Sequence, residues 1–169
     1  MQQLQAWLEL LPDAALLVDR EGRIVFANTQ AEGMFGYAPH ALVGQAVEAL
    51  IPSRLQSQHV QDRERYAAAP HKRAMGAGMD LYALRRDGAE IPVDIALGPL
   101  NVEGRVLVLS VIRDITERKR VETHMKQEKQ ELERVNQLMM DREDRVMELK
   151  QEVNTLCRQV GQPPKYTVA

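Results

Sequence analysis

The chain has 169 residues, of which 44% are hydrophobic and 27% charged, so it can bury one core with an appendage but not two full domains. Its net charge of −2 provides no basic field for nucleic acid or an anionic membrane surface. The longest apolar run, Val106 to Ile112, is far too short to cross a bilayer, and the N-terminus lacks a signal-peptide pattern. Cys157 is the single cysteine and cannot form an intrachain disulfide, so we expect a cytoplasmic protein.

Glycine and proline divide the chain into two parts. Nine of the ten glycines and six of the eight prolines lie between Leu11 and Ile115, and neither residue occurs from Thr116 to Val160. We therefore predict four segments: a lead-in helix over 1–10, a folded domain over 11–115, a long helix over 116–160 and a disordered tail over 161–169.

The first elements in chain order are a short helix and a hairpin. Leu4 and Leu8 share one helical face of the lead-in segment. The apolar runs 14–18 and 24–27 flank the polar turn 19–22, which is typical of a β-hairpin.

Helical signals follow the hairpin. The side chain of Asn28 can accept a hydrogen bond from a free amide, so we expect it to cap a helix that carries Met34 and Phe35. Proline is favoured at the first position of a helix and serine as its N-cap, so Pro39 and Ser53 predict further short helices up to Pro70.

Strands dominate the next part. The stretch 79–100 predicts two strands joined at Asp87 and Gly88, a pair that tolerates the backbone of a tight turn. After a turn at 101–104, the aliphatic run from Val106 predicts a last strand. Two strands, several short helices and three strands predict an α+β domain, with an antiparallel sheet and helices to one side.

Several separated motifs together resemble a PAS domain, over Leu11 to Lys119. They occur in the order expected for that family and are the hairpin "DREGRI", Asn28 opening a helix that closes on "FGY", then "LVG", "RRDG" and "RDIT". The resemblance implies a five-stranded antiparallel sheet with helices across one face and a small-molecule pocket between them. We take as pocket candidates Phe26, Met34, Phe35, Leu50, Leu55, His59, Met75, Met79, Leu81, Val93, Ile95 and Leu109.

The last strand runs into the long helix without an intervening glycine or proline. Asp114 can cap this helix, and Glu117, three residues later, completes a pair that resembles a capping box. In the family that the chain resembles, the last strand feeds an output helix directly, so we assign a signal relay to Asp114, Ile115 and Thr116.

A heptad repeat follows along the long helix. With Met125 at position a, ten of the twelve a and d positions from residue 121 to residue 160 are apolar, which predicts a coiled coil. Glu128 and Arg142 occupy d positions and weaken it, because burying an unpaired charge costs free energy. We expect a homodimer formed through Val121, Met125, Leu132, Val135, Met139, Val146, Leu149, Val153 and Leu156.

No cofactor follows from the residues. In haem-binding PAS domains the histidine ligand stands where this chain has Arg73 or Arg65, and arginine is not an ordinary haem ligand. The nearby His59 and His71 are interpreted as surface residues, so the sequence argues against haem. A covalent flavin is excluded because Cys157 lies in the long helix, and we predict no metal site.

The resulting hypothesis is a PAS sensory module of the bacterial two-component type. It dimerises and relays a change induced by a ligand or partner, through the coiled coil, to an output such as a histidine kinase or response regulator. Two alternatives stay open: a ligand-free dimerisation adaptor, and a haem or flavin sensor with atypical ligation. We expect no catalytic residue, because no enzyme motif is complete and His124 lacks the surroundings of a phosphoacceptor histidine.

Overall fold

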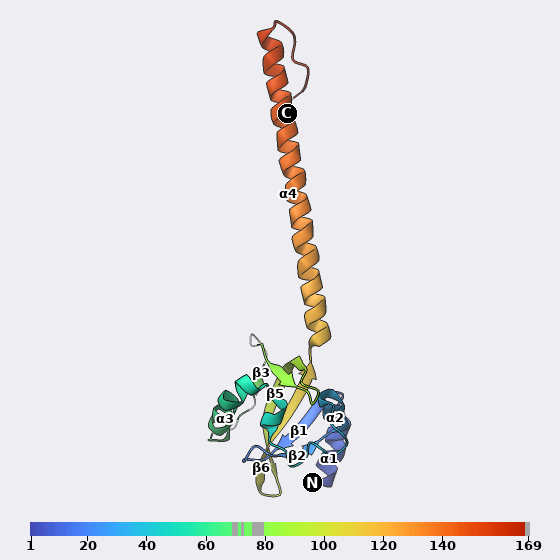
Figure 1. The fold of residues 1–169 in the computed structure, drawn as a ribbon, viewed down its shortest axis with the longest axis vertical. Coiled ribbons are helices and arrows are strands. Elements are labelled where there is room, and N and C mark those ends of the chain that lie inside the picture. The colour runs from blue at the N-terminus through green and yellow to red at the C-terminus, as the bar shows by residue number, and fades with distance from the viewer. Residues whose placement is uncertain (69–70, 72, 76–79, 168–169) are drawn as a thin grey trace. The chain divides into compact units, whose positions relative to one another are not determined.

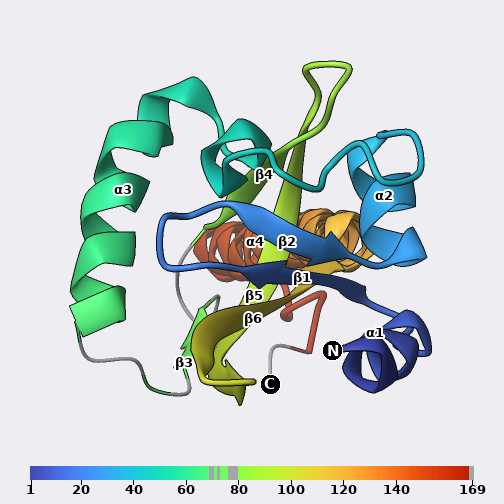
Figure 2. The same ribbon diagram turned by 90° about the horizontal axis from the view of Figure 1, so that it is seen from below.

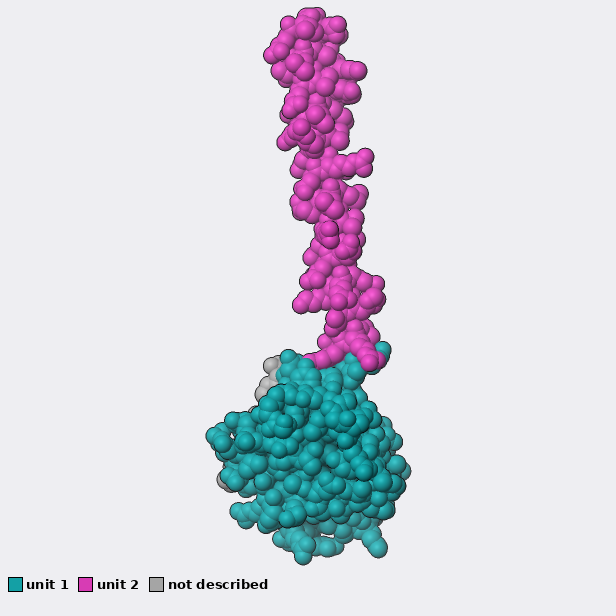
Figure 3. Space-filling view, in the orientation of Figure 1, with its two compact units in different colours: residues 1–118 teal, residues 119–169 magenta. Residues whose placement is uncertain are grey.

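The computed structural model describes residues 1–68, 71, 73–75 and 80–167. The chain divides into two compact units, Met1–Arg118 and Lys119–Ala169 (Figure 3). None of the described helices is both long enough and apolar enough to cross a membrane.

The first unit is an antiparallel sheet with helices on both faces (Figures 1 and 2). Its helices are α1 (Gln2–Glu9), α2 (Thr29–Phe35), the 3-10 turn η1 (Val47–Leu50) and α3 (Ser53–Ala68). Its strands are β1 (Ala14–Val18), β2 (Ile24–Ala27), β3 (Arg73–Met75), β4 (Tyr82–Leu84), β5 (Glu90–Val102) and β6 (Arg105–Asp114).

The sheet has five strand positions, in the order β2, β1, β6, β5 and finally an edge position shared by β3 and β4. Both short strands pair with the same side of β5, β3 with Ile95–Leu97 and β4 with Glu90–Pro92. The five-stranded antiparallel sheet that the resemblance implied is therefore confirmed. Strand β3 was not predicted from the sequence.

The sheet separates two hydrophobic clusters. On the inner face, alternate residues of β1 pack with α2 and η1, and on the outer face the remaining residues pack with α1. Figure 2 shows α1 and α2 on opposite sides of β1. Strand β1 is buried on both faces because one hydrophobic cluster covers each of them, which explains its continuous apolar sequence. Leu8 of α1 is 5% exposed, whereas Trp7 is 66% exposed.

The turn and cap predictions of the N-terminal half are confirmed. Gly22 has φ +85° in the turn between β1 and β2, and Asp19 accepts a hydrogen bond from the backbone of Arg23 at 2.8 Å. Asn28 caps α2 by accepting from the amide of Ala31 at 2.9 Å, and Gly36 ends the helix with φ +75°.

The helix expected near Pro39 is reduced to η1. The backbone of this segment bonds to β2 instead: Gly44 donates to the carbonyl oxygen of Ile24 at 2.7 Å, and Ile24 donates to that of Gln45 at 2.9 Å. Gly44 has φ +87°, which a right-handed helix does not allow. Pairing with a strand edge thus replaces the helical hydrogen bonds.

The second unit consists mainly of α4 (Thr116–Gln159), which begins in the first unit and continues to the end of the heptad repeat. Gly161, with φ +75°, follows the helix, and residues 161–167 then turn back. Asn154 holds this return: its Oδ1 accepts from the amides of Lys165 and Tyr166 at 2.8 and 2.9 Å. The expectation of a disordered tail thus differs from the structure over 161–167.

Candidate functional site

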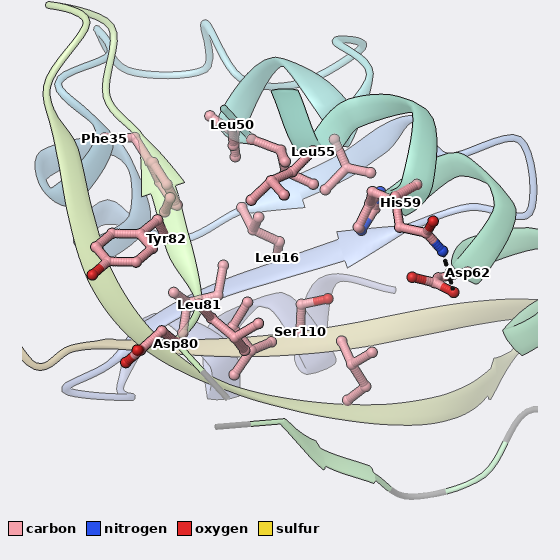
Figure 4. A pocket seen from close by; sticks show the side chains of 17 residues that line it. Leu16, Phe35, Leu50, Leu55, His59, Asp62, Asp80, Leu81, Tyr82 and Ser110 are labelled. Carbon is pink, nitrogen blue, oxygen red and sulfur yellow. Dashed lines mark hydrogen bonds between the residues drawn. The ribbon is translucent and has the colours of Figure 1, made fainter. Parts of the chain in front are cut away.

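A cavity of about 500 Å³ lies between α3 and the inner face of the sheet (Figure 4). Small-molecule sites in proteins have volumes of roughly 300–1,000 Å³ and mostly apolar walls with a few polar groups. The polar lining residues are Gln58, His59, Asp62, Asp80, Tyr82 and Ser110. The apolar lining residues are Leu16, Phe35, Val47, Leu50, Ile51, Leu55, Leu81, Ala83, Ile95, Leu97 and Ile112.

Helix α3 turns a polar side toward this cavity. Leu55, Gln58, His59 and Asp62 follow the spacing i, i+3, i+4 and i+7, which places them on one helical face. Gln58 donates to Oδ1 of Asp62 at 3.2 Å, as the dashed line in Figure 4 marks. Leu55, Gln58 and Asp62 are exposed and His59 is partly buried, so this face forms the solvent-accessible edge of the cavity.

A smaller cavity of about 110 Å³ adjoins the first one and is also covered by α3. Both cavities are lined by His59, Asp62 and Ser110, together with Val47 and Leu97. Ser110 lies in β6 opposite Leu16 and is 7% exposed. The hydroxyl of Ser110 is thus a buried polar group in the apolar floor.

Three charged or polar side chains hold α3 to η1 beside the cavity. Glu48 accepts from Nε of Arg63 at 3.0 Å, and its Oε1 lies 3.1 Å from Nδ1 of His59. Burial raises the pKa of the Glu48 carboxyl, but hydrogen bonds from its own backbone, Arg63 and His59 outweigh that effect and lower the pKa below its ordinary value. Glu48 is therefore an ionised acceptor, and Nδ1 of His59 carries the shared proton.

Six of the predicted pocket residues line the cavity. They are Phe35 in α2, Leu50 in η1, Leu55 and His59 in α3, Leu81 next to β4, and Ile95 in β5. His59 had been interpreted as a surface residue, but its partly buried ring lines both cavities. Met34 and Val93 belong to the inner hydrophobic cluster and do not line the cavity.

Two of the predicted pocket residues lie on the wrong side of the sheet. Phe26 and Leu109 belong to the outer cluster with Leu8 of α1. Successive residues of a strand point to opposite faces, and the sequence prediction did not fix which residues face inward. Met79 lies outside the described residues, and so does the side chain of Met75.

The sequence prediction missed Gln58, Asp62 and Ser110, although a signal was present for the first two. Their spacing from Leu55 and His59 along α3 places all four on one helical face, which lies at the exposed edge of the cavity. Ser110 interrupts the aliphatic run of β6, but only the strand register shows that it faces inward, opposite Leu97 of β5.

The positions compared with haem-binding relatives do not provide a histidine ligand. Arg65 is 74% exposed in its side chain and its Nη1 lies 3.6 Å from Asp62. The side chain of Arg73 lies outside the described residues. In the described part of the chain no three His, Cys, Asp or Glu side chains gather as a metal site would require. These residues do not fit haem bound in the way that the resemblance suggests.

The junction of β6 and α4 is tied to the neighbouring strand. The amide of Ile115 donates to the carbonyl oxygen of Pro92 at 3.0 Å, and its side chain is 6% exposed. Asp114 accepts from the amide of Thr116, the first residue of α4, at 2.7 Å. Nη1 of Arg118 lies 2.9 Å from Oδ2 of Asp94 on β5. The first turn of α4 is therefore anchored to two strands.

Comparison with known proteins identifies the domain. Residues 8–120 match the family model described as PAS fold, and the chain belongs to this family. The PAS domain of a protein from Colwellia psychrerythraea is 22% identical and has a TM-score of 0.58, with 69% of this chain and 97% of that chain covered.

Two curated relatives are signalling proteins. Sensor protein FixL of Bradyrhizobium diazoefficiens is 29% identical over 135 residues, which cover 80% of this chain and 27% of FixL. The cell-division control histidine kinase PdhS of Brucella ovis is 26% identical over 137 residues, which cover 80% of this chain and 13% of PdhS. The chain thus spans about a quarter or less of these relatives.

Proposed function

We propose that this chain is a sensory module whose PAS domain takes up a small molecule beneath α3 and relays its presence through α4. The cavity of about 500 Å³ carries the proposal, because a domain filled by its own side chains would leave no such space. This observation favours a ligand sensor over a ligand-free adaptor.

The relay is proposed to run through the junction at residues 114–116. Strands β5 and β6 form part of the cavity floor. The same strands hold the first turn of α4, β5 through Pro92 and Asp94 and β6 through Asp114. A ligand that binds one arrangement of these strands more tightly shifts the population toward that arrangement. A hydrogen-bonded junction transmits such a shift, whereas a flexible linker absorbs it.

The output is proposed to be a kinase and the working form a homodimer. PdhS is named a histidine kinase, and its similarity extends over 80% of this chain. The predicted dimerisation residues of α4 other than Val153 are exposed in the single chain, with Met125 at 63% and Leu132 at 62%. A row of exposed apolar side chains at heptad spacing fits a second copy of the helix.

Native mass spectrometry of freshly purified protein tests this function. We expect a dimer that carries a reproducible added mass, and we expect Ser110→Phe to lose that mass because the new ring fills the floor of both cavities. Ser57→Phe is the matched control, since it adds the same ring at an exposed position of α3 outside the cavity. Circular dichroism establishes that both variants fold. Equal added mass on Ser110→Phe and the wild type would contradict the proposal.

A further inference from the structure

The polar groups of the cavity lie on two sides of it. Gln58, His59 and Asp62 line the cavity from α3, which we call the roof, whereas the polar residues opposite them are Ser110 on β6 and Asp80 and Tyr82 at β4, among otherwise apolar strand residues. Figure 4 shows His59 and Asp62 at α3 and Ser110 on a strand of the sheet. An occupant that matches these walls has an apolar body on the sheet and a polar end at the helix.

The roof presents hydrogen-bond acceptors. Gln58 uses its amide nitrogen on Oδ1 of Asp62, which leaves the amide oxygen of Gln58 and Oδ2 of Asp62. Within the part of the chain that the structure describes, neither of these oxygens has a hydrogen-bond partner. An ionised carboxylate accepts only, and an amide oxygen likewise accepts.

His59 adds a third acceptor to the roof. Its Nδ1 faces the ionised carboxylate of Glu48 at 3.1 Å and therefore carries the proton. In the neutral imidazole the other nitrogen, Nε2, then offers a lone pair, and no described residue bonds to it. Three acceptors on neighbouring turns of one helix call for a ligand that donates.

The charge of the cavity agrees with this pattern. Its charged lining residues among those described are Asp62 and Asp80, and the described lining includes no lysine or arginine. The nearby Arg63 is already bound to Glu48 at 3.0 Å and to the carbonyl oxygen of Arg20 at 3.2 Å. Arg65 lies 3.6 Å from Oδ1 of Asp62, and Arg20 and Arg63 line the adjoining cavity. Among the described lining residues of the larger cavity, an anionic ligand would therefore lose hydration beside Asp62 without contacting a lining cation.

We propose that the ligand is a small amphipathic molecule with an N–H or O–H donor at its polar end, cationic or neutral but not anionic. This assignment rests on the proposed ligand-sensing function and specifies the chemistry of its site. The donor lies against Asp62, Gln58 and His59, and the apolar body lies over Ser110 and the strands.

Three probes with one apolar chain test the assignment: 1-octylamine, 1-octanol and octanoate, titrated at pH 7.5 into the full chain. Amide chemical shifts in ¹⁵N-labelled protein give the affinity and show whether α3 and β6 respond. We expect octylamine and octanol to bind and octanoate to bind at least about tenfold more weakly, which corresponds to a difference of about 1.4 kcal/mol.

Asp62→Asn gives a more specific test, because asparagine has nearly the same side-chain volume as aspartate but carries an NH2 donor in place of one acceptor oxygen. We expect this substitution to lower the affinity for octylamine about tenfold and to raise the affinity for octanoate. Glu64→Gln is the control, because Glu64 is an exposed residue of the same helix and the substitution changes the net charge equally. It should leave all three affinities unchanged.

The outcomes separate this assignment from the function on which it rests. Octanoate binding as tightly as octylamine, with shifts in α3 and β6, would overturn the donor assignment and keep the ligand-sensing function. Binding by none of the three probes would overturn the donor assignment as well. If the purified protein then also carried no added mass, the proposed function would fail with it.

Discussion

Asn28 is the residue on which three segments of the first unit depend. Its side chain is fully buried, and Oδ1 accepts from the amides of Ala15 and Ala31 at 2.8 and 2.9 Å. Its Nδ2 donates to the carbonyl oxygens of Leu8 and Asp13, each at 3.0 Å. One side chain therefore joins α1, β1 and α2, and each of its hydrogen-bonding positions is used.

We predict that Asn28→Ala lowers the free energy of unfolding by about 2–4 kcal/mol, because it leaves buried backbone groups without partners and removes the cap of α2. Urea denaturation measures the change. Asn101→Ala, at an exposed position of β5, should change the free energy by less than about 0.5 kcal/mol. Equal effects of the two substitutions would show that the four hydrogen bonds do not stabilise the fold.

Glu48 should make stability depend on pH in the acidic range. Its pKa is lower in the folded protein than its ordinary value of 4.5, so the ionised form stabilises the fold. This contribution is complete above about pH 4.5 and is lost as the pH falls through the lower folded pKa.

We predict that Glu48→Gln destabilises the protein at pH 7 and that the difference from the wild type shrinks as the pH falls below 4.5. Thermal unfolding measured from pH 3 to pH 7 gives the comparison. Glu64→Gln, on the exposed side of α3, is the matched control for loss of one carboxylate. A difference that stays constant with pH would mean that the ionisation of Glu48 contributes nothing.

At the scale of elements, the junction of β6 and α4 decides whether the two units are coupled. The amide of Ile115 donates to the carbonyl oxygen of Pro92 and that of Thr116 to the side chain of Asp114, and two glycines would make this turn free to adopt many conformations. We predict that replacing both residues by glycine abolishes the response of α4 to an occupied cavity and leaves binding in the cavity intact.

Hydrogen exchange along α4, measured with and without 1-octanol, reports this coupling. The same two-glycine replacement at Gln159 and Val160 is the control, because it loosens the far end of the helix and spares the junction. A ligand-dependent change in α4 that survives the replacement at Ile115 and Thr116 would exclude the junction as the relay.

For the whole molecule, turn and cap chemistry made most of the fold predictable. Gly22, Asn28 and the pair Asp87 and Gly88 have local roles that residue type alone indicates, and the elements they bound form as expected. Strand β3 escaped prediction because it has three residues and depends on pairing with β5.

The candidate site was harder to predict than the fold because it depends on strand register. Phe26 and Leu109 have the composition of pocket residues, yet they face α1 across the outer side of the sheet. Ser110 lines the cavity because its pairing with Leu16 and Leu97 turns it inward. A shift of one residue reverses every such assignment, and no local property of the sequence determines it.

The assembly of the whole molecule depends on α4. Its exposed a and d residues predict association, and Leu149, at a d position, is 44% exposed in the single chain. Burial of one leucine contributes about 1.5–3 kcal/mol, and a symmetric dimer buries two copies. We predict that Leu149→Asp weakens the dimer at least about a hundredfold and leaves the first unit folded, because that unit ends at Arg118.

Sedimentation equilibrium measures the association, and Gln151→Asp at an exposed f position should leave it unchanged.

The charged d positions give the opposite test, since the double substitution Glu128→Leu with Arg142→Leu should tighten the dimer. Met139 and Val146, at neighbouring a positions, already line a groove with Arg142 on the single helix, so an apolar residue there extends the contact surface. If the wild-type protein were a monomer at the concentrations used for the amide chemical-shift titrations, the coiled-coil prediction would be wrong. The relay would then have to act through one helix alone.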